Sequence, residues 1–120
     1  MKNKSIIRNA EIINENQKFI GDLAIEDSFI SEIKSESISG TFDLEYDGTG
    51  LTIIPGMIDD QVHFREPGLT HKANIYTESR AAVAGGITSF MEMPNTIPNT
   101  VTQQLLEEKF QIAKKNSLAN

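Results

Sequence analysis

Four polar residues at alternate positions form the most chemically suggestive pattern in this sequence. Asp59, Gln61, His63 and Arg65 lie within the segment PGMIDDQVHFREPG, residues 55–68. Because side chains alternate across a β-strand, all four are expected on one face of a strand through this segment. Imidazole binds metals, and guanidinium forms paired hydrogen bonds with carboxylates. An edge strand with one solvent-exposed face would explain the alternation without any site.

A second polar group follows the next predicted strand. The short apolar run ITSFMEM, residues 87–93, leads into Pro94 and Asn95, which taken alone would belong to an ordinary turn. In βα folds, however, ligands bind at the carboxyl ends of the strands. His63, Arg65 and Asn95 together would suit a small, anionic, amide-bearing ligand. This convergence favours a binding site over an exposed strand face.

The elements that would position these residues follow from periodicity. The apolar stretch 51–64 predicts a strand interrupted by Pro55-Gly56, and residues 73–84 have helical spacing that ends at Gly85-Gly86. Residues 87–93 predict a second strand, and residues 102–115 predict a second helix with Thr102 as its N-cap. Strand, helix, strand and helix with helical crossovers imply parallel pairing.

The first fifty residues predict a different architecture of short strands. Residues 21–33 predict a hairpin whose turn is Asp27-Ser28, and DGTG at 47–50 predicts another turn. We therefore expect a small antiparallel β-module before the βα region.

Composition restricts the classes of function. The 120 residues are 38% hydrophobic and 23% charged, carry a net charge of −6 and include no cysteine. The acidic net charge argues against a nucleic-acid surface, and the absence of cysteine excludes disulfides and thiolate metal ligands. No apolar run reaches the roughly 18 residues of a membrane span, and the first residues do not resemble a signal peptide.

The segment PGMIDDQVHFREPG, followed by THK and AAVAGGITSFMEMPNT, resembles the opening of the dihydroorotases of the amidohydrolase superfamily. The family pattern is Asp-x-His-x-His-x-Arg, then Pro-Gly, and later Met-Pro-Asn-Thr. The resemblance covers essentially the whole chain and is most specific in residues 55–96. It implies an α/β fold, with residues 1–52 as a small β-module of a composite β-sandwich. Residues 53–120 would form the first two βα units of a TIM-type (β/α)₈ barrel that is incomplete in this chain.

The resemblance also implies roles for individual residues. His63 matches a first-strand metal ligand, and Arg65 and Asn95 match the residues that hold the substrate carboxylate. Asp59 matches the acid that opens the motif, with a structural or supporting role. Gln61 stands where the family has its other first-strand histidine, and a carboxamide is a poor zinc ligand. The metal site is therefore expected to be weakened, altered or completed differently. His71 is expected to order its loop rather than bind metal.

The implied function is reversible cyclisation of N-carbamoyl-L-aspartate to L-dihydroorotate in pyrimidine biosynthesis, assisted by one or two zinc ions in the intact enzyme. A (β/α)₈ barrel needs roughly 200 residues, so we expect an N-terminal fragment that is inactive alone and binds no zinc. We assign no catalytic residue in these 120 residues, because we expect no Asp or Glu at a later strand end.

The resemblance further implies a cytoplasmic homo-oligomer that acts on a small molecule, associates with aspartate transcarbamoylase and binds neither nucleic acid nor membrane. Two alternatives stay open. One is a catalytically silent homologue that serves as a scaffold for a partner enzyme, which metal analysis would distinguish. The other is a different cyclic amidase such as an allantoinase, which a substrate assay would distinguish.

Overall fold

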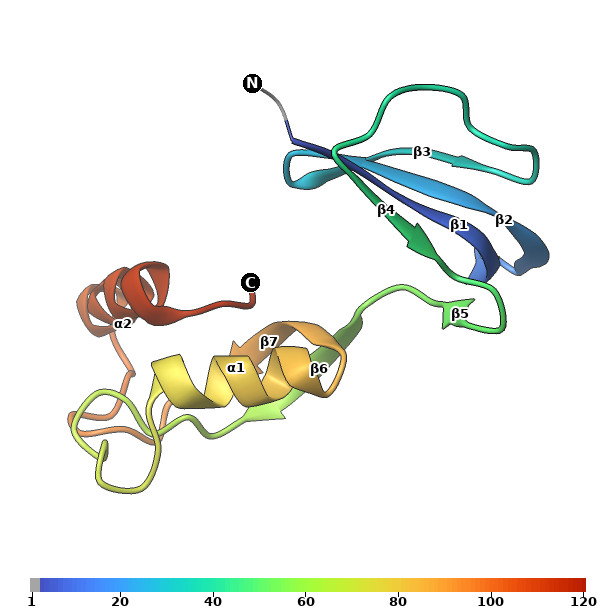
Figure 1. Ribbon diagram of the computed structural model, residues 1–120. Helices are drawn as coiled ribbons and strands as arrows, with labels where there is room; N and C mark the ends of the chain where they lie inside the picture. Colours follow the sequence, from blue (N-terminus) through green and yellow to red (C-terminus); the bar gives the residue numbers. More distant parts are fainter. Residues whose placement is uncertain (1–2) are drawn as a thin grey trace. The chain divides into compact units, whose positions relative to one another are not determined.

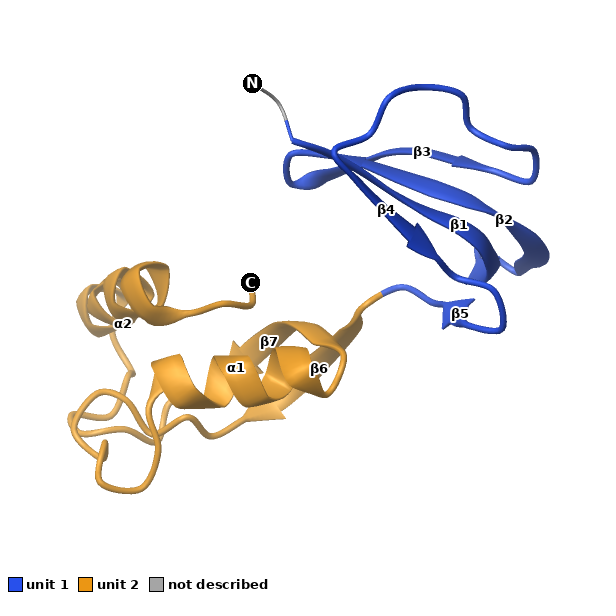
Figure 2. Ribbon diagram, in the orientation of Figure 1, with its two compact units in different colours: residues 1–55 blue, residues 56–120 orange. Residues whose placement is uncertain are grey.

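The computed structural model describes residues 3–120, and the chain forms two compact units, residues 1–55 and 56–120 (Figure 2). The chain passes from one unit to the other between Pro55 and Gly56. No helix among the described residues is long and apolar enough to cross a membrane.

The first unit is a five-stranded sheet (Figure 1). Its strands are β1 (Lys4–Asn14), β2 (Gln17–Glu26), β3 (Phe29–Lys34), β4 (Leu44–Asp47) and β5 (Thr52–Ile53). The spatial order is β3-β2-β1-β4, and β5 also pairs with β1. The pairs β1·β2 and β2·β3 are antiparallel, and the hairpin predicted in residues 21–33 is confirmed, with Asp27 at a φ of 55° in its turn.

The expectation of a wholly antiparallel module is wrong, because β4 and β5 both run parallel to β1. A parallel neighbour requires a crossover, and residues 35–43 supply it between β3 and β4. This crossover is anchored by Ile38, which is buried with Ile6 and Ala24 in the core of the unit. A polar loop therefore holds one apolar anchor that local sequence did not reveal.

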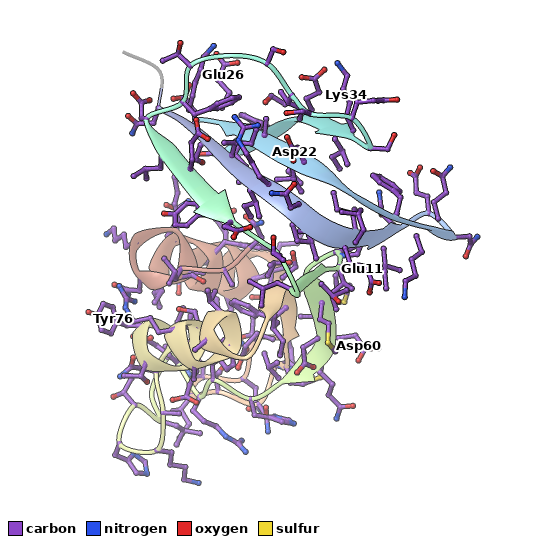
Figure 3. The ribbon with its side chains drawn as sticks, turned by 45° about the vertical axis from the view of Figure 1, so that its right-hand side comes forward. Glu11, Asp22, Glu26, Lys34, Asp60 and Tyr76 are labelled. Atoms are coloured by element: carbon purple, nitrogen blue, oxygen red, sulfur yellow. The ribbon has the colours of Figure 1, made fainter. Side chains whose placement is uncertain are left out.

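Asp22 on β2, labelled in Figure 3, is the buried charge of this sheet. Its carboxylate accepts hydrogen bonds from the backbone N–H groups of Asn9 (3.1 Å) and Ile38 (3.1 Å). Arg8 adds an ion pair at 2.9 Å. Buried carboxylates need such partners, so these contacts tie β1, β2 and the crossover loop together.

The second unit contains β6 (Met57–Val62), α1 (Ile75–Ala84), β7 (Ile87–Glu92) and α2 (Gln103–Asn116). The predicted order and the parallel pairing of β6 with β7 are confirmed. The interruption predicted at Pro55-Gly56 is confirmed: β5 and β6 are separate strands, with residues 54–56 between them. Pro55 has no N–H to donate to a strand ladder, which explains the break. Because β6 ends at Val62, His63 and Arg65 lie beyond the strand.

Local capping positions both helices. The side chain of Asn74 accepts a hydrogen bond from Thr77 N at the start of α1, and Thr102, the predicted N-cap of α2, accepts one from Leu105 N. Gly85 caps α1 with an ordinary φ of −86°, and it is Gly86 that takes the positive φ of 91°. The predicted ends of both helices are therefore correct to within two residues.

The core of the second unit is formed by Val62, Phe64 and Ile75, and the rings of Phe64 and Phe90 lie 4.6 Å apart. Val62 is buried, whereas Ile58, which alternation would place on the same face of β6, is 65% exposed, and the pairing of β6 with β7 shifts register between Asp59 and Val62. His63 lies between two buried residues and is itself exposed. The alternation predicted for this segment therefore holds around His63.

Candidate functional site

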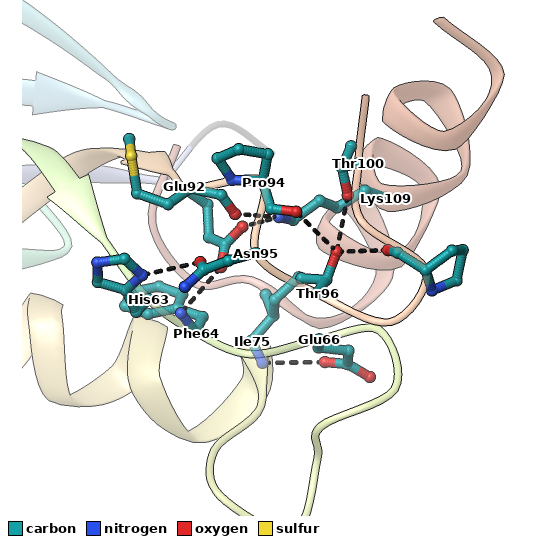
Figure 4. Close-up of polar contacts among 12 residues, drawn as sticks. His63, Phe64, Glu66, Ile75, Glu92, Pro94, Asn95, Thr96, Thr100 and Lys109 are labelled. Carbon is teal, nitrogen blue, oxygen red and sulfur yellow. Dashed lines mark hydrogen bonds and ion pairs between the residues drawn. The ribbon is translucent and has the colours of Figure 1, made fainter. Parts of the chain in front are cut away.

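The ends of β6 and β7 are joined by a hydrogen bond between two predicted site residues. His63 Nδ1 lies 2.9 Å from Asn95 Oδ1, although the residues are 32 positions apart (Figure 4). The structure thus brings imidazole and carboxamide together at the carboxyl ends of two parallel strands. Their roles as metal ligand and substrate ligand stay predictions.

The backbone beside this pair is held by a side chain rather than by the strand ladder alone. Met93 N donates to Val62 O at 2.9 Å, and Phe64 N then donates to the Glu92 carboxylate at 3.0 Å. Phe64 lies between His63 and Arg65. Glu92 therefore supplies the acceptor where β6 has already ended.

Glu92 itself is paired with Lys109 from α2, and the two side chains are only 8% and 7% exposed. Lys109 Nζ also donates to Met93 O at 2.8 Å, and burial lowers the pKa of this lysine. Neither residue was predicted from the sequence, and the expectation that no acid stands at a later strand end is wrong, because Glu92 is the last residue of β7. Lys109 lies four residues after Leu105 and three before Ile112, so its place on the apolar face of α2 was the available signal.

Arg65 adopts a left-handed backbone conformation with a φ of 67° and is half-buried. This conformation is uncommon for a bulky residue, and it ends the strand-like alternation before Arg65. Leu69 N donates to Arg65 O at 3.0 Å, but the guanidinium has no hydrogen-bond partner within residues 3–120. Among residues 3–120, no hydrogen bond joins Arg65 to Asn95, whose Oδ1 contacts His63.

Gln61 and Asp59 form a local contact. Gln61 N donates to Asp59 Oδ1 at 3.1 Å, which is consistent with a structural role for this acid, and Gln61 is exposed. His71 is also exposed, in the turn-rich loop before α1. Among the described residues, neither Gln61 nor His71 forms a hydrogen bond with His63.

The two loops that follow the strands are packed against each other. Ile97 N donates to Pro67 O at 3.0 Å, and Glu66 Oε2 accepts a hydrogen bond from Ile75 N at 2.9 Å. The buried hydroxyl of Thr96 donates to Pro98 O at 2.8 Å. These bonds order the loops on which Arg65 and Asn95 stand.

Of the two residues predicted at the first-strand metal positions, only His63 has a side chain that suits a metal ion. His63 has Nδ1 engaged by a carboxamide oxygen, as metal-bound histidines commonly have, and this leaves Nε2 for the ion. Gln61 does not fit zinc, which prefers imidazole or thiolate. Within residues 3–120 no group of three or more His, Cys, Asp or Glu side chains is arranged to hold a metal ion.

Comparison with known proteins places these motifs in one family. The family described as "Dihydro-orotase-like" matches residues 50–118. A dihydroorotase of Methanosarcina acetivorans is 39% identical over 114 residues, which cover 95% of this chain and 24% of that protein. A dihydroorotase of Enterococcus faecalis is 38% identical over 116 residues, which cover 96% of this chain and 27% of that protein.

Proteins with other names are similar as well. An allantoinase of Salmonella paratyphi B is 41% identical over 110 residues, covering 91% of this chain and 24% of that protein. Among solved structures, the L-hydantoinase (dihydropyrimidinase) of Arthrobacter aurescens superposes with a TM-score of 0.90 at 25% identity, covering all of this chain and 27% of that one. The chain spans about a quarter of the length of these relatives.

Proposed function

This chain belongs to the dihydro-orotase-like family, and we propose that it is the amino-terminal part of a metal-assisted enzyme that opens and closes a cyclic amide. The proposed reaction is the interconversion of N-carbamoyl-L-aspartate and L-dihydroorotate. The proposal rests on the His63–Asn95 hydrogen bond, which unites the two predicted strand ends in one site. Two of the similar proteins named above are dihydroorotases.

The proposed architecture is the first part of a β-sandwich in residues 1–55 and the first two βα units of a (β/α)₈ barrel in residues 56–120. Parallel β6 and β7, each followed by a helix, support the barrel. β7 is hydrogen-bonded along both edges, since Phe90 N donates to Asn120 O at 2.9 Å and Asn120 N donates to Thr88 O at 3.0 Å. Pairing on both sides is typical of an interior barrel strand.

In this proposal His63 binds zinc through Nε2, while Arg65 and Asn95 bind the substrate carboxylate. A guanidinium and a carboxamide NH₂ group both donate to carboxylate oxygens, and the unpaired guanidinium of Arg65 has donors available. Bound zinc would supply a water of lowered pKa and polarise the ring amide carbonyl. The residues of this chain contribute binding and orientation.

The test is an assay of the full-length protein in both directions, with dihydroorotate and N-carbamoyl-L-aspartate, beside allantoin and hydantoin as alternative substrates. Turnover of dihydroorotate alone supports the proposal, and turnover of allantoin alone supports the allantoinase alternative. Arg65→Lys should lower kcat/KM because the planar fork is lost, by about 1.5–3 kcal/mol of transition-state stabilisation. Arg80→Lys, on the exposed face of α1, is the matched control that should leave kcat/KM unchanged.

Gln61 favours one second candidate, a silent homologue that binds and supports a partner enzyme such as aspartate transcarbamoylase. Its amide replaces an imidazole, and its backbone contact is only local. A full-length protein that contains no zinc, turns over none of these substrates and co-purifies with the transcarbamoylase would establish this alternative.

A further inference from the structure

The Glu92 carboxylate lies where a backbone carbonyl would continue the sheet. Met93 N donates to Val62 O, and the next contact toward the site is Phe64 N to Glu92 Oε1 at 3.0 Å. Phe64 is buried, so its N–H needs an acceptor from the protein. The acceptor is a side chain, so replacing that side chain can release the backbone at this point without removing a strand.

Lys109 contacts both the Glu92 carboxylate and the backbone at the end of β7 (Figure 4). Its Nζ pairs with Glu92 and donates to Met93 O, which lies two residues before Asn95. Figure 4 shows the two side chains meeting between β7 and α2, close to His63 and Asn95. One ion pair therefore touches the backbone of both segments that bear predicted site residues.

Stability alone is a weak reason for this arrangement. Moving two charges out of water is costly, and apolar residues of similar volume often replace a buried ion pair without loss of stability. An apolar residue at position 92 would, however, leave Phe64 N–H without its acceptor. The pair thus provides geometry that an apolar pair would not.

We propose that Glu92 and Lys109 are a positioning pair for the candidate site. Glu92 fixes the backbone between His63 and Arg65, and Lys109 fixes both Glu92 and the segment that leads to Asn95. The inference rests on the proposed function, because it assigns the pair to the orientation of the zinc ligand and the substrate ligands.

The experiment compares two double variants of the full-length protein that both lack the buried charges. Glu92→Gln with Lys109→Met keeps an oxygen acceptor for Phe64 N. The second double variant, Glu92→Met with Lys109→Met, is called the methionine variant: its side chain at position 92 is of similar length but offers Phe64 N no acceptor. The measurements are the melting temperature, amide exchange at Phe64, zinc affinity by chelator competition, and kcat and KM.

We expect the glutamine variant to retain slow exchange at Phe64 and a zinc affinity and kcat close to those of the wild type. The methionine variant should melt at a similar temperature but exchange faster at Phe64. Its zinc affinity or kcat should fall by about 10- to 100-fold, the range for residues that orient a metal ligand. If the methionine variant does not fold, Glu92→Leu with Lys109→Met takes its place with the same expected result.

Two contrary outcomes are distinguishable. An active, zinc-binding wild type whose two double variants match each other in zinc affinity, kcat and KM overturns the positioning role alone. A wild type that neither binds zinc nor turns over any of the substrates refutes the proposed function, and the positioning role falls with it.

Discussion

The hydrogen bond between His63 and Asn95 determines which ring nitrogen is available for a metal. If zinc binds Nε2, then Nδ1 carries the proton and must donate it, and Asn95 Oδ1 at 2.9 Å is the acceptor. The carboxamide then keeps its NH₂ group as a donor for a substrate carboxylate. Asn95 would in this way serve the metal with its oxygen and the substrate with its nitrogen.

Replacing Asn95 separates these two roles. Asn95→Asp keeps an oxygen acceptor for His63 but loses the NH₂ donor, so zinc affinity should be retained while KM for dihydroorotate rises. Asn95→Leu loses both groups, and its zinc affinity should fall by about 10- to 100-fold. Chelator competition and steady-state kinetics on the full-length protein measure the two effects. Equal zinc affinity in the two variants would show that the His63 contact has no role in metal binding.

Gln61→His tests the departure from the family pattern. An imidazole at this exposed position would offer zinc a donor it prefers over a carboxamide oxygen, so bound zinc per chain or zinc affinity should rise. Gln61→Asn keeps the amide and should leave both quantities unchanged. Unaltered zinc content and activity in Gln61→His, or a native protein in which Gln61 already binds zinc, would contradict this account.

The sequence predicted which residue types gather at the strand ends, but it did not reveal what holds them. His63 was predictable from the polar alternation of its segment, and Asn95 was predictable because it follows a strand of recognisable pattern. The contact between Glu92 and Lys109 was not, because it depends on how α2 packs on β7. The left-handed conformation of Arg65 also has no local signal, since arginine rarely adopts it.

Helix ends were the most predictable features of the secondary structure, whereas the pairing of distant strands was the least. Asn and Thr caps act within one turn, so the sequence nearby determines them. The parallel pairing of β4 and β5 with β1 joins residues about forty positions apart, as in Arg8 opposite Asp47 and Glu11 opposite Thr52. The crossover is anchored by the buried side chain of Ile38 and by the hydrogen bond from Ile38 N to Asp22, and one apolar residue in a polar loop does not predict either contact.

The loops after β6 and β7 meet at Gly68, which provides a matched test of their packing. Gly68 has a φ of 85°, and an added Cβ would lie 2.1 Å from Ile97 O. Gly86 has a φ of 91° with nothing within 4 Å of that position, so Gly86→Ala should cost only the backbone strain of about 1–2 kcal/mol. Gly68→Ala should cost more, because it also separates Ile97 from Pro67. Urea unfolding measures both losses, and equal values would show that the loops adjust freely.

Asp22 should make the stability of the first unit depend on pH. Burial alone would raise the pKa of this carboxyl, but the hydrogen bonds from Ile38 and Asn9 and the charge of Arg8 outweigh burial and lower the pKa. A lowered folded-state pKa gives stability that is fully present above the unfolded value of about 3.9 and is lost as pH falls through the folded value. Asp22→Asn should therefore cost about 1.5–3 kcal/mol near neutral pH, the range for hydrogen bonds to a charged group.

The difference in the free energy of unfolding between the wild type and Asp22→Asn should shrink on acidification, because a protonated Asp22 has also lost its negative charge. Urea unfolding at a series of pH values follows it, and Glu15→Gln, at an exposed carboxylate in the turn between β1 and β2, is the comparison variant. A difference that stays constant down to the most acidic pH would show that Asp22 contributes by shape and not by charge.

The two units of this chain leave much apolar surface uncovered. Among residues 3–120, nineteen large apolar side chains are exposed and nine apolar residues are buried. In the second unit the exposed set includes Met91, Leu106, Phe110 and Leu118, which line an apolar groove of about 620 Å³. Contiguous apolar surface of this kind normally contacts other protein, so the 120-residue polypeptide on its own should self-associate.

The net charge of −6 opposes that association and supplies the means to test it. Salt screens repulsion between exposed charges, with a Debye length of about 8 Å at 0.15 M, while it leaves apolar contacts in place. The mass measured by sedimentation should therefore increase with both protein concentration and salt. Phe110→Ser should weaken association through the second unit, and Phe29→Ser, at a side chain 77% exposed on β3, tests the first unit in the same way. A polypeptide that stays monomeric at high concentration and high salt would show that these exposed side chains are tolerated singly and do not form a cohesive surface.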